Sequence, residues 1–226
     1  MSRWPTPVGL RSSSVAEAQA AATVGVDAVI AQGIEAGGHV RGTTSIWELL
    51  PATVAAVGEL PVLASGGIGD GAGVARALRL GAQGVSLGTR FVASEEAFIH
   101  PAYKQRTSRP GRRTPSTTSS MTSGGRTPPH RTLRNKTLQE WEAAGRPPPG
   151  QRPEEGVPIG TFRSPSGERV PWPRYAVGVA TADFDGDIDY APLWAGESCS
   201  LVNGLKPAAA IVGDLVRDAE VALADS

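Results

Sequence analysis

The sequence has 226 residues, of which 40% are hydrophobic, so it can bury one sizeable core, although 28 glycines and 19 prolines place much of the chain in turns and loops. The 22 lysines and arginines balance 22 aspartates and glutamates. This balance argues against nucleic acid or an anionic membrane surface as the partner, and it favours a small neutral or anionic ligand.

The single cysteine, Cys199, can form no internal disulfide, and two methionines and one cysteine offer no metal-ligand cluster. Residues 1–10 lack the apolar segment of a signal peptide, and no stretch approaches the roughly 20 apolar residues of a membrane span. We therefore expect a soluble, cytoplasmic protein.

The first hundred residues alternate between helix and strand patterns. Helices are predicted at 14–23, 46–57 and 71–80, and short apolar runs bounded by glycine predict buried strands at 28–31, 62–64 and 84–87. This alternation indicates a parallel α/β sheet, in a barrel or an open form. We expect an ordered core at 8–104 in which the carboxyl ends of the strands face one pocket.

The pattern stops in residues 107–128, which contain only Ser, Thr, Arg, Pro and Gly apart from Met121, with four arginines and no acidic residue. Because this segment has almost nothing to bury, we expect it to be irregular and exposed. A second interpretation is a compensated frameshift. Back-translated with GC-rich codons and read one base earlier, residues 120–128 can encode Phe-Asp-Asp-Val-Gly-Trp-Pro-Asp-Ala, which is typical of a folded protein.

Ordinary sequence resumes at residue 129. A short helix is predicted at 137–144, a proline-rich extended segment at 146–153 and a final amphipathic helix at 207–224. These elements are expected to cover the sheet or to form a subunit contact in a homo-oligomer.

The densest candidate site follows the first predicted strand, in the sequence Gln-Gly-Ile-Glu-Ala-Gly-Gly-His of residues 32–39. Glycines at the carboxyl end of a parallel strand let backbone amides approach a ligand, and active sites of α/β barrels lie at that end. Gln32 could meet a polar ring edge. His39 is the candidate catalytic residue, because His100 and His130 lie outside the predicted strand ends. The alternative is that His39 is a satisfied loop residue.

Two more glycine-rich turns follow the next strands, at 64–71 and 88–91. Their amides and the helix that follows offer an anion site, although tight turns between a strand and a helix also require glycine. Two such turns late in the repeat match the phosphate site between the last two strands of many barrels. Arg90 either adds charge to that site or forms a salt bridge outside the barrel.

The sequence at these positions resembles the nitronate monooxygenase family, once called 2-nitropropane dioxygenases. The resemblance covers about residues 8–104 and is carried by 32–39, 61–70 and 84–96, followed by His100-Pro101 and Tyr103-Lys104. It resumes in residues that are similar to the tail of one subgroup: Arg131, Leu133-Arg134-Asn135, Trp141-Glu142, Arg152-Pro153, Gly186-Asp187 and Ala195-Gly196-Glu197-Ser198.

The resemblance implies a (β/α)8 TIM barrel, of which this chain is the carboxyl-terminal half, because family barrels begin with further strand–helix units. It divides the chain into a partial FMN-binding barrel at 1–104, a low-complexity basic segment at 105–128, and an extension with the terminal helix of the same domain at 129–226.

The resemblance further implies non-covalent FMN as the cofactor. The residues expected beside the flavin and its phosphate are Gln32, Gly37, Gly38, Ser65, Gly66, Gly67, Gly88 and Thr89. Family members oxidise alkyl nitronates with dioxygen; the flavin carries the redox chemistry, and the protein positions the substrate. His39 would then act in turnover.

Two alternatives remain open at this stage. A flavin-dependent enoyl-acyl carrier protein reductase shares the Glu-Ala-Gly-Gly-His motif of residues 35–39 and would use NAD(P)H and an acyl thioester. The chain could also be a non-catalytic fragment, since half a barrel leaves two strand edges unpaired and a core face open.

Overall fold

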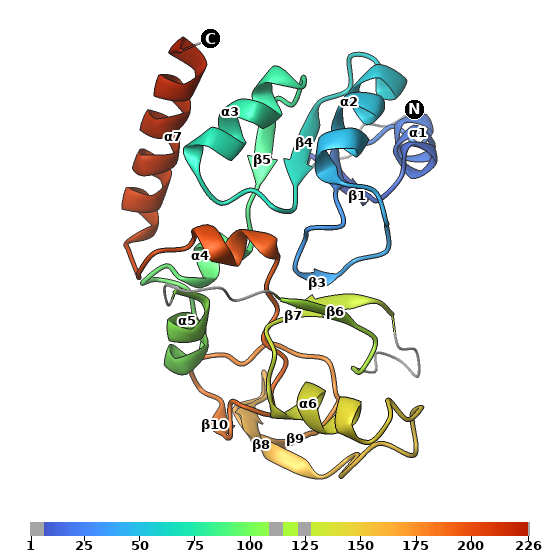
Figure 1. Cartoon of the computed structure of the whole chain (residues 1–226), viewed down its shortest axis with the longest axis vertical. Coiled ribbons are helices and arrows are strands. Elements are labelled where there is room, and N and C mark those ends of the chain that lie inside the picture. Colours follow the sequence, from blue (N-terminus) through green and yellow to red (C-terminus); the bar gives the residue numbers. More distant parts are fainter. Residues whose placement is uncertain (1–6, 109–114, 122–127, 226) are drawn as a thin grey trace.

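The computed structural model describes residues 7–108, 115–121 and 128–225. Its amino-terminal part is a four-stranded parallel sheet in the order β1-β2-β4-β5 (Figure 1). The strands are β1 (Gly9–Ser12), β2 (Ala28–Gln32), β4 (Val62–Ser65) and β5 (Gly84–Ser86). The three predicted strands and their parallel pairing are confirmed. The edge strand β1 was not predicted, because its Gly-Leu-Arg-Ser sequence contains no apolar run.

Three helices follow strands of this sheet at the predicted places: α1 (Val15–Thr23), α2 (Ile46–Val57) and α3 (Gly71–Arg79). Each begins after a residue whose side chain accepts a hydrogen bond from an amide of the first turn, namely Ser14, Ser45 and Asp70. The sequence therefore sets both the position and the start of these helices.

One face of the sheet packs on the helices. Ala31 and Ala64 lie on that face and are fully buried with Ile46 and Leu50 of α2. Each fully buried Ile or Leu side chain contributes about 1.5–3 kcal/mol through burial. The opposite face holds the alternate residues of each strand and is left for a ligand cavity.

The remaining chain forms a cover at the carboxyl ends of the strands (Figure 1). It contains two three-stranded antiparallel sheets, one of β3 (Gly38–His39), β7 (His130–Thr132) and β6 (Ser116–Thr118), and one of β10 (Asp185–Gly186), β8 (Pro158–Arg163) and β9 (Arg169–Pro173). Its helical segments are α4 (Thr89–Val92), α5 (Pro101–Ser108), α6 (Lys136–Ala143) and the 3-10 helix η1 (Glu197–Leu201). The last helix, α7 (Ala208–Ala224), lies beside the parallel layer instead. The second sheet was not anticipated in a tail expected to be mostly irregular and helical.

The terminal helix α7 lies alongside α3 (Figure 1). The two helices approach so closely that a Cβ atom at Gly71 would lie 2.5 Å from the backbone nitrogen of Ala219. Glycine at this position therefore lets the end of the chain dock on the parallel layer. None of the helices in the described ranges combines the length and apolar character needed to cross a bilayer.

The prediction that 107–128 is irregular and exposed is wrong for its described residues. Thr107 and Ser108 are buried at the end of α5, β6 pairs with β7, and Met121 is 1% exposed and packs with Leu138. The composition argument counted apolar side chains only, whereas backbone pairing with β7 orders β6 through hydrogen bonds. Residues 109–114 and 122–127 lie outside the described ranges.

Candidate functional site

A cavity of about 470 Å³ lies at the carboxyl ends of the parallel strands, where the sequence placed the pocket. The structure brings together there all of the predicted cofactor-binding residues except Gly38. Those that line the cavity are Gln32, Gly37, Ser65, Gly66, Gly67, Gly88 and Thr89. Gly38 instead lies in β3, with a φ of 71°, and pairs with Arg131 of β7.

The two glycines after β4 are required by the backbone. Gly66 and Gly67 have φ values of 104° and 70°, which side-chain-bearing residues rarely adopt. A Cβ atom at Gly66 would lie 3.0 Å from the nitrogen of Ala36, and one at Gly67 would lie 3.0 Å from Cβ of Glu35. These glycines thus let the loops after β2 and β4 pack together at the rim of the cavity.

Gly88 is different, because no atom of the described residues lies within 4 Å of the place where its Cβ would be. Its φ of −102° is also open to other residues. No protein contact therefore requires glycine here, although the residue lines the cavity. The missing Cβ leaves space at the cavity wall.

The backbone amides of these loops are free for a ligand. Within the described ranges, no acceptor pairs with the amides of Gly66, Gly67 and Ile68, nor with those of Gly88 and Thr89. Unpaired amides beside a cavity form a site suited to an anion. The residues present therefore fit a phosphate group.

Glu35 fixes the loop after β2. Its carboxylate accepts hydrogen bonds from the hydroxyl of Ser45 at 2.5 Å and from the amide of Ile46 at 3.0 Å, at the start of α2. Negative charge is favourable at a helix amino terminus. Glu35 therefore anchors the Gly-rich loop to the helical layer, and its acidic side chain is used for structure.

The cover holds the same loop from the other side. Arg131 of β7 donates a 2.8 Å hydrogen bond to the carbonyl of Ile34 and forms a 3.0 Å ion pair with Glu197. A Cβ atom at Gly37 would lie only 2.5 Å from the nitrogen of Gly196. Glycine at 37 is thus needed for the tail to reach the cavity.

His39 lies outside this cavity. It is exposed on β3 and lines a second cavity of about 530 Å³, to which Arg11 and Gln32 also belong. Because Gln32 and Arg11 line both cavities, they connect His39 with the glycine loops.

The structure also places His130 beside His39, whereas sequence analysis set it apart. The β3–β7 register puts the two residues opposite each other, with ring centroids 6.4 Å apart, and both rings contact Trp194. His130 is fully buried, and this burial lowers its pKa below the ordinary value.

The aromatic wall of the cavity was not predicted from the sequence. Tyr103 and Trp194 line it, and the Tyr103 hydroxyl donates a 2.5 Å hydrogen bond to the carbonyl of Trp194. Burial raises the pKa of Tyr103, so the hydroxyl stays protonated at neutral pH. Thr89 contributes by accepting a 2.9 Å hydrogen bond from the amide of Gly196. The Trp-Ala-Gly-Glu-Ser sequence at 194–198 was the available signal.

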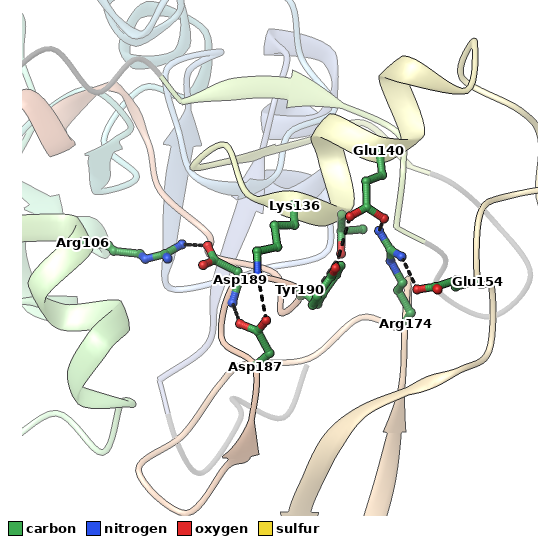
Figure 2. A network of polar contacts seen from close by, with 9 residues as sticks. Arg106, Lys136, Glu140, Glu154, Arg174, Asp187, Asp189 and Tyr190 are labelled. Carbon is green, nitrogen blue, oxygen red and sulfur yellow. Dashed lines mark hydrogen bonds and ion pairs between the residues drawn. The ribbon is translucent and has the colours of Figure 1, made fainter.

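A network of charged and polar side chains includes residues of the segment that precedes Trp194 (Figure 2). Arg174, whose side chain is 1% exposed, pairs with Glu140 at 2.7 Å and with Glu154 at 3.0 Å. Tyr190 donates a 3.1 Å hydrogen bond to Glu140, and Arg106 of α5 pairs with Asp189. The segment that leads into Trp194 is thereby tied to α5 and α6.

Arg90 does not line the cavity. It is buried in α4, and burial lowers its pKa while Asp214 of α7 opposes that shift. Its Nη1 atom has no hydrogen-bond partner in the described part of the chain. The geometry therefore bears out neither the phosphate contact nor a formed salt bridge.

The chain is similar to known proteins along nearly its whole length. It is 35% identical over 222 residues to the nitronate monooxygenase of Pseudomonas aeruginosa, covering 93% of this chain and 57% of that protein. The nitronate monooxygenase of Paraburkholderia phytofirmans is 34% identical, with 92% and 53% covered. The chain thus spans a little over half the length of these relatives.

Solved structures show the same fold. FabK from Thermotoga maritima aligns with a TM-score of 0.77 at 29% identity, covering 97% of this chain and 63% of FabK. Nitroalkane oxidase from Streptomyces ansochromogenes aligns with a TM-score of 0.71 at 25% identity, with 97% and 59% covered. The family model of nitronate monooxygenase matches residues 8–218. Sequence and structure agree, and the chain belongs to the nitronate monooxygenase family.

Proposed function

We propose that this chain is the carboxyl-terminal half of an FMN-binding (β/α)8 barrel, and that the whole protein oxidises alkyl nitronates with dioxygen. The observation that carries the proposal is the pair of glycine loops whose unpaired amides line one cavity. The two edge strands, β1 and β5, have no further strand beside them in the described residues, which supports a barrel continued by other strands.

The amides of 65–68 and 88–89 would hold the FMN phosphate, and Gln32 and Gly37 would lie near the flavin ring. FMN, when bound, supplies the redox chemistry. The chain's own residues position the cofactor through Glu35 and Arg131, which fix the loop, and exclude water with the Tyr103–Trp194 wall.

His39 would act on the substrate. Imidazole is the side-chain base best suited to proton transfer near neutral pH. Gln32 joins the cavity of His39 to that of the glycine loops, so a substrate at Gln32 would face both. The contacts with His130 and Trp194 hold the His39 ring in place.

FMN titration tests the cofactor site. The chain, alone and joined to the amino-terminal units of the Pseudomonas aeruginosa relative, is titrated with FMN while flavin fluorescence is recorded. Gly88→Leu fills the open cavity wall and should weaken FMN binding at least about tenfold, since it displaces charge-assisted hydrogen bonds. Gly67→Trp should abolish FMN retention. Gly213→Leu, in α7 and away from the cavity, is the control, because among the described residues no atom lies within 4 Å of its Cβ position and its φ is not positive.

Parental FMN affinity in the Gly88 and Gly67 variants would overturn the phosphate assignment. His39→Ala should keep FMN but lower nitronate turnover by about 10²–10⁴-fold, the usual contribution of a positioned acid or base. Parental turnover in that variant would remove the catalytic role of His39.

The structural likeness to FabK, with its TM-score of 0.77, favours one second candidate, the flavin-dependent reduction of an enoyl-acyl carrier protein. NAD(P)H-driven loss of a crotonoyl thioester, without nitronate oxidation, would replace the first proposal by the second. Loss of FMN binding both alone and in the joined protein would indicate a non-catalytic fragment. Sedimentation of the chain would show whether it forms the expected homo-oligomer.

A further inference from the structure

Arg11 of β1 faces the cavity. It is the register partner of Ile30, while the next residue, Ser12, is the partner of Ala31, which is fully buried under the helices. Register partners in a parallel sheet project to the same face and successive residues to opposite faces. Arg11 therefore projects away from the helices, to the face that carries Gln32, and both residues line the cavity.

Arg11 is also the charged side chain that lines this cavity. Among the described residues that line it, no carboxylate, lysine or histidine occurs, and Tyr103 stays neutral because burial raises its pKa. The guanidinium of Arg11 has no hydrogen-bond or ion-pair partner in the described ranges. The cavity thus contains one unpaired cation and, in the loops after other strands, a separate set of unpaired amides.

We propose that Arg11 is the residue that selects an anionic substrate, by pairing with the two oxygens of a nitronate. A guanidinium offers two parallel N–H donors that match two oxygens of one planar anion. A neutral nitroalkane and an enoyl thioester carry no charge at the reacting group, so Arg11 would favour the nitronate over both. This inference rests on the proposed function and names the determinant of its substrate class.

The assignment is distinct from the phosphate site. The amides assigned to the phosphate belong to the loops after β4 and β5, whereas Arg11 lies on β1, at the opposite edge of the sheet order. The loops could therefore bind the phosphate of one ligand while Arg11 binds a second, smaller anion.

Nitrate is a suitable probe, because it is planar and anionic but undergoes no oxidation here. Calorimetry measures its binding to the chain in saturating FMN, for the parent, Arg11→Gln and Arg11→Lys. Arg11→Gln should weaken nitrate binding about tenfold or more, the usual effect of losing charged hydrogen bonds. The nitrate affinity of Arg11→Lys should lie between those of the parent and Arg11→Gln, because lysine keeps the charge and loses the paired donors.

The matched control is Arg217→Gln. Arg217 of α7 lines neither cavity, its side chain is 63% exposed, and it pairs with Asp214 at 2.9 Å. This variant should bind nitrate as the parent does. The neutral 2-methyl-2-nitropropane should bind equally to the parent and Arg11→Gln. In the joined protein, Arg11→Gln should raise KM for a nitronate and leave kcat within about twofold, since the loss is in binding.

Parental nitrate affinity in Arg11→Gln would overturn the inference, as would the absence of nitrate binding to the parent. A parallel fall in FMN affinity would also overturn it, because Arg11 would then serve the cofactor. These outcomes are separate from failure of the proposed function, which is read from FMN binding and nitronate turnover in the parent.

Discussion

The parallel sheet and the cover are stabilised by different kinds of contact. The sheet packs Ala31, Ala64, Ile46 and Leu50 into an apolar layer under the helices. The cover buries many polar and charged groups. In the described ranges, nine buried side-chain polar atoms have no hydrogen-bond partner, and six of these atoms belong to residues 120–175. They belong to Ser120, His130, Arg131, Arg152, Arg174 and Tyr175.

This difference explains which region is specified locally. An apolar layer forms when each helix and strand carries apolar residues at the spacing of its own structure, so the local sequence pattern specifies the layer. A buried guanidinium requires a partner from a distant segment, because an uncompensated charge is costly. The cover therefore depends on contacts over long stretches of the chain, such as Arg174 with Glu140.

The largest effect is expected in the sheet's apolar layer. Leu50 is fully buried, so Leu50→Ala should lower the free energy of unfolding by about 3–4 kcal/mol, through lost burial and the cavity left behind. Urea unfolding measures this. Leu223→Ala, at a residue 38% exposed, is the control and should change stability by less than about 0.5 kcal/mol. Equal losses in the two variants would contradict the apolar layer as the main stabiliser.

In the cover, the sign of the charge removed should matter. Replacing both Glu140 and Glu154 by Gln leaves the buried Arg174 without counter-ions and should cost about 2 kcal/mol, less than a fully buried pair because both carboxylates are partly exposed. Arg174→Met leaves two hydrated carboxylates and should cost less, under about 1.5 kcal/mol. Urea unfolding of both variants is the measurement, and the reverse order would contradict the argument.

Helix caps allow a matched test of the two regions. Asp70 caps α3 through the amide of Gly73 at 2.8 Å, and Asp70→Ala should cost about 1 kcal/mol. Asn135 caps α6 through Leu138 at 2.9 Å and also donates to the carbonyl of Ala191 at 2.7 Å.

Asn135→Ala should therefore cost about 1 kcal/mol more than Asp70→Ala, since a buried carbonyl loses its donor as well. Thermal unfolding midpoints of the two variants give the difference. Equal costs would show that the cap in the cover acts only locally.

The smallest effect concerns pH. Burial lowers the pKa of His130 below its ordinary value of 6.5, so the native state takes up this proton less readily than the unfolded chain. The stability that depends on neutral His130 is full above that value and is lost as the pH falls below it, with a slope of at most about 1.4 kcal/mol per pH unit.

In His130→Phe, the loss of unfolding free energy between pH 7.5 and 5.5 should therefore be smaller than in the parent. His100, whose pKa burial also lowers, stays partly exposed, and His100→Gln should reduce the loss less. An unchanged pH dependence in His130→Phe would rule out this source.

The compensated frameshift stays a prediction. Residues 122–127, where the alternative reading departs most from the present sequence, lie outside the described ranges. The nucleotide sequence of codons 105–130 provides the test: a single uninterrupted frame shared with close relatives would contradict it.

The sequence by itself determined the parallel layer and the residues at its carboxyl edge. The spacing of apolar residues, together with the glycines that bound each run, predicted the helices of this layer and three of its strands. The turns after the strands contain glycines with a positive φ, such as Gly66 and Gly67. These features are local, because each depends on a few neighbouring residues, and parallel strands necessarily bring their carboxyl ends to one edge.

Only the tertiary structure decided what closes that edge. Tyr103 and Trp194 meet although they are 91 positions apart in the chain, and His130 lies beside His39 through the β3–β7 pairing. It also decided that Arg11, on a strand with no apolar run, faces the cavity. Such contacts arise from the register of strands far apart in sequence, which no local period encodes.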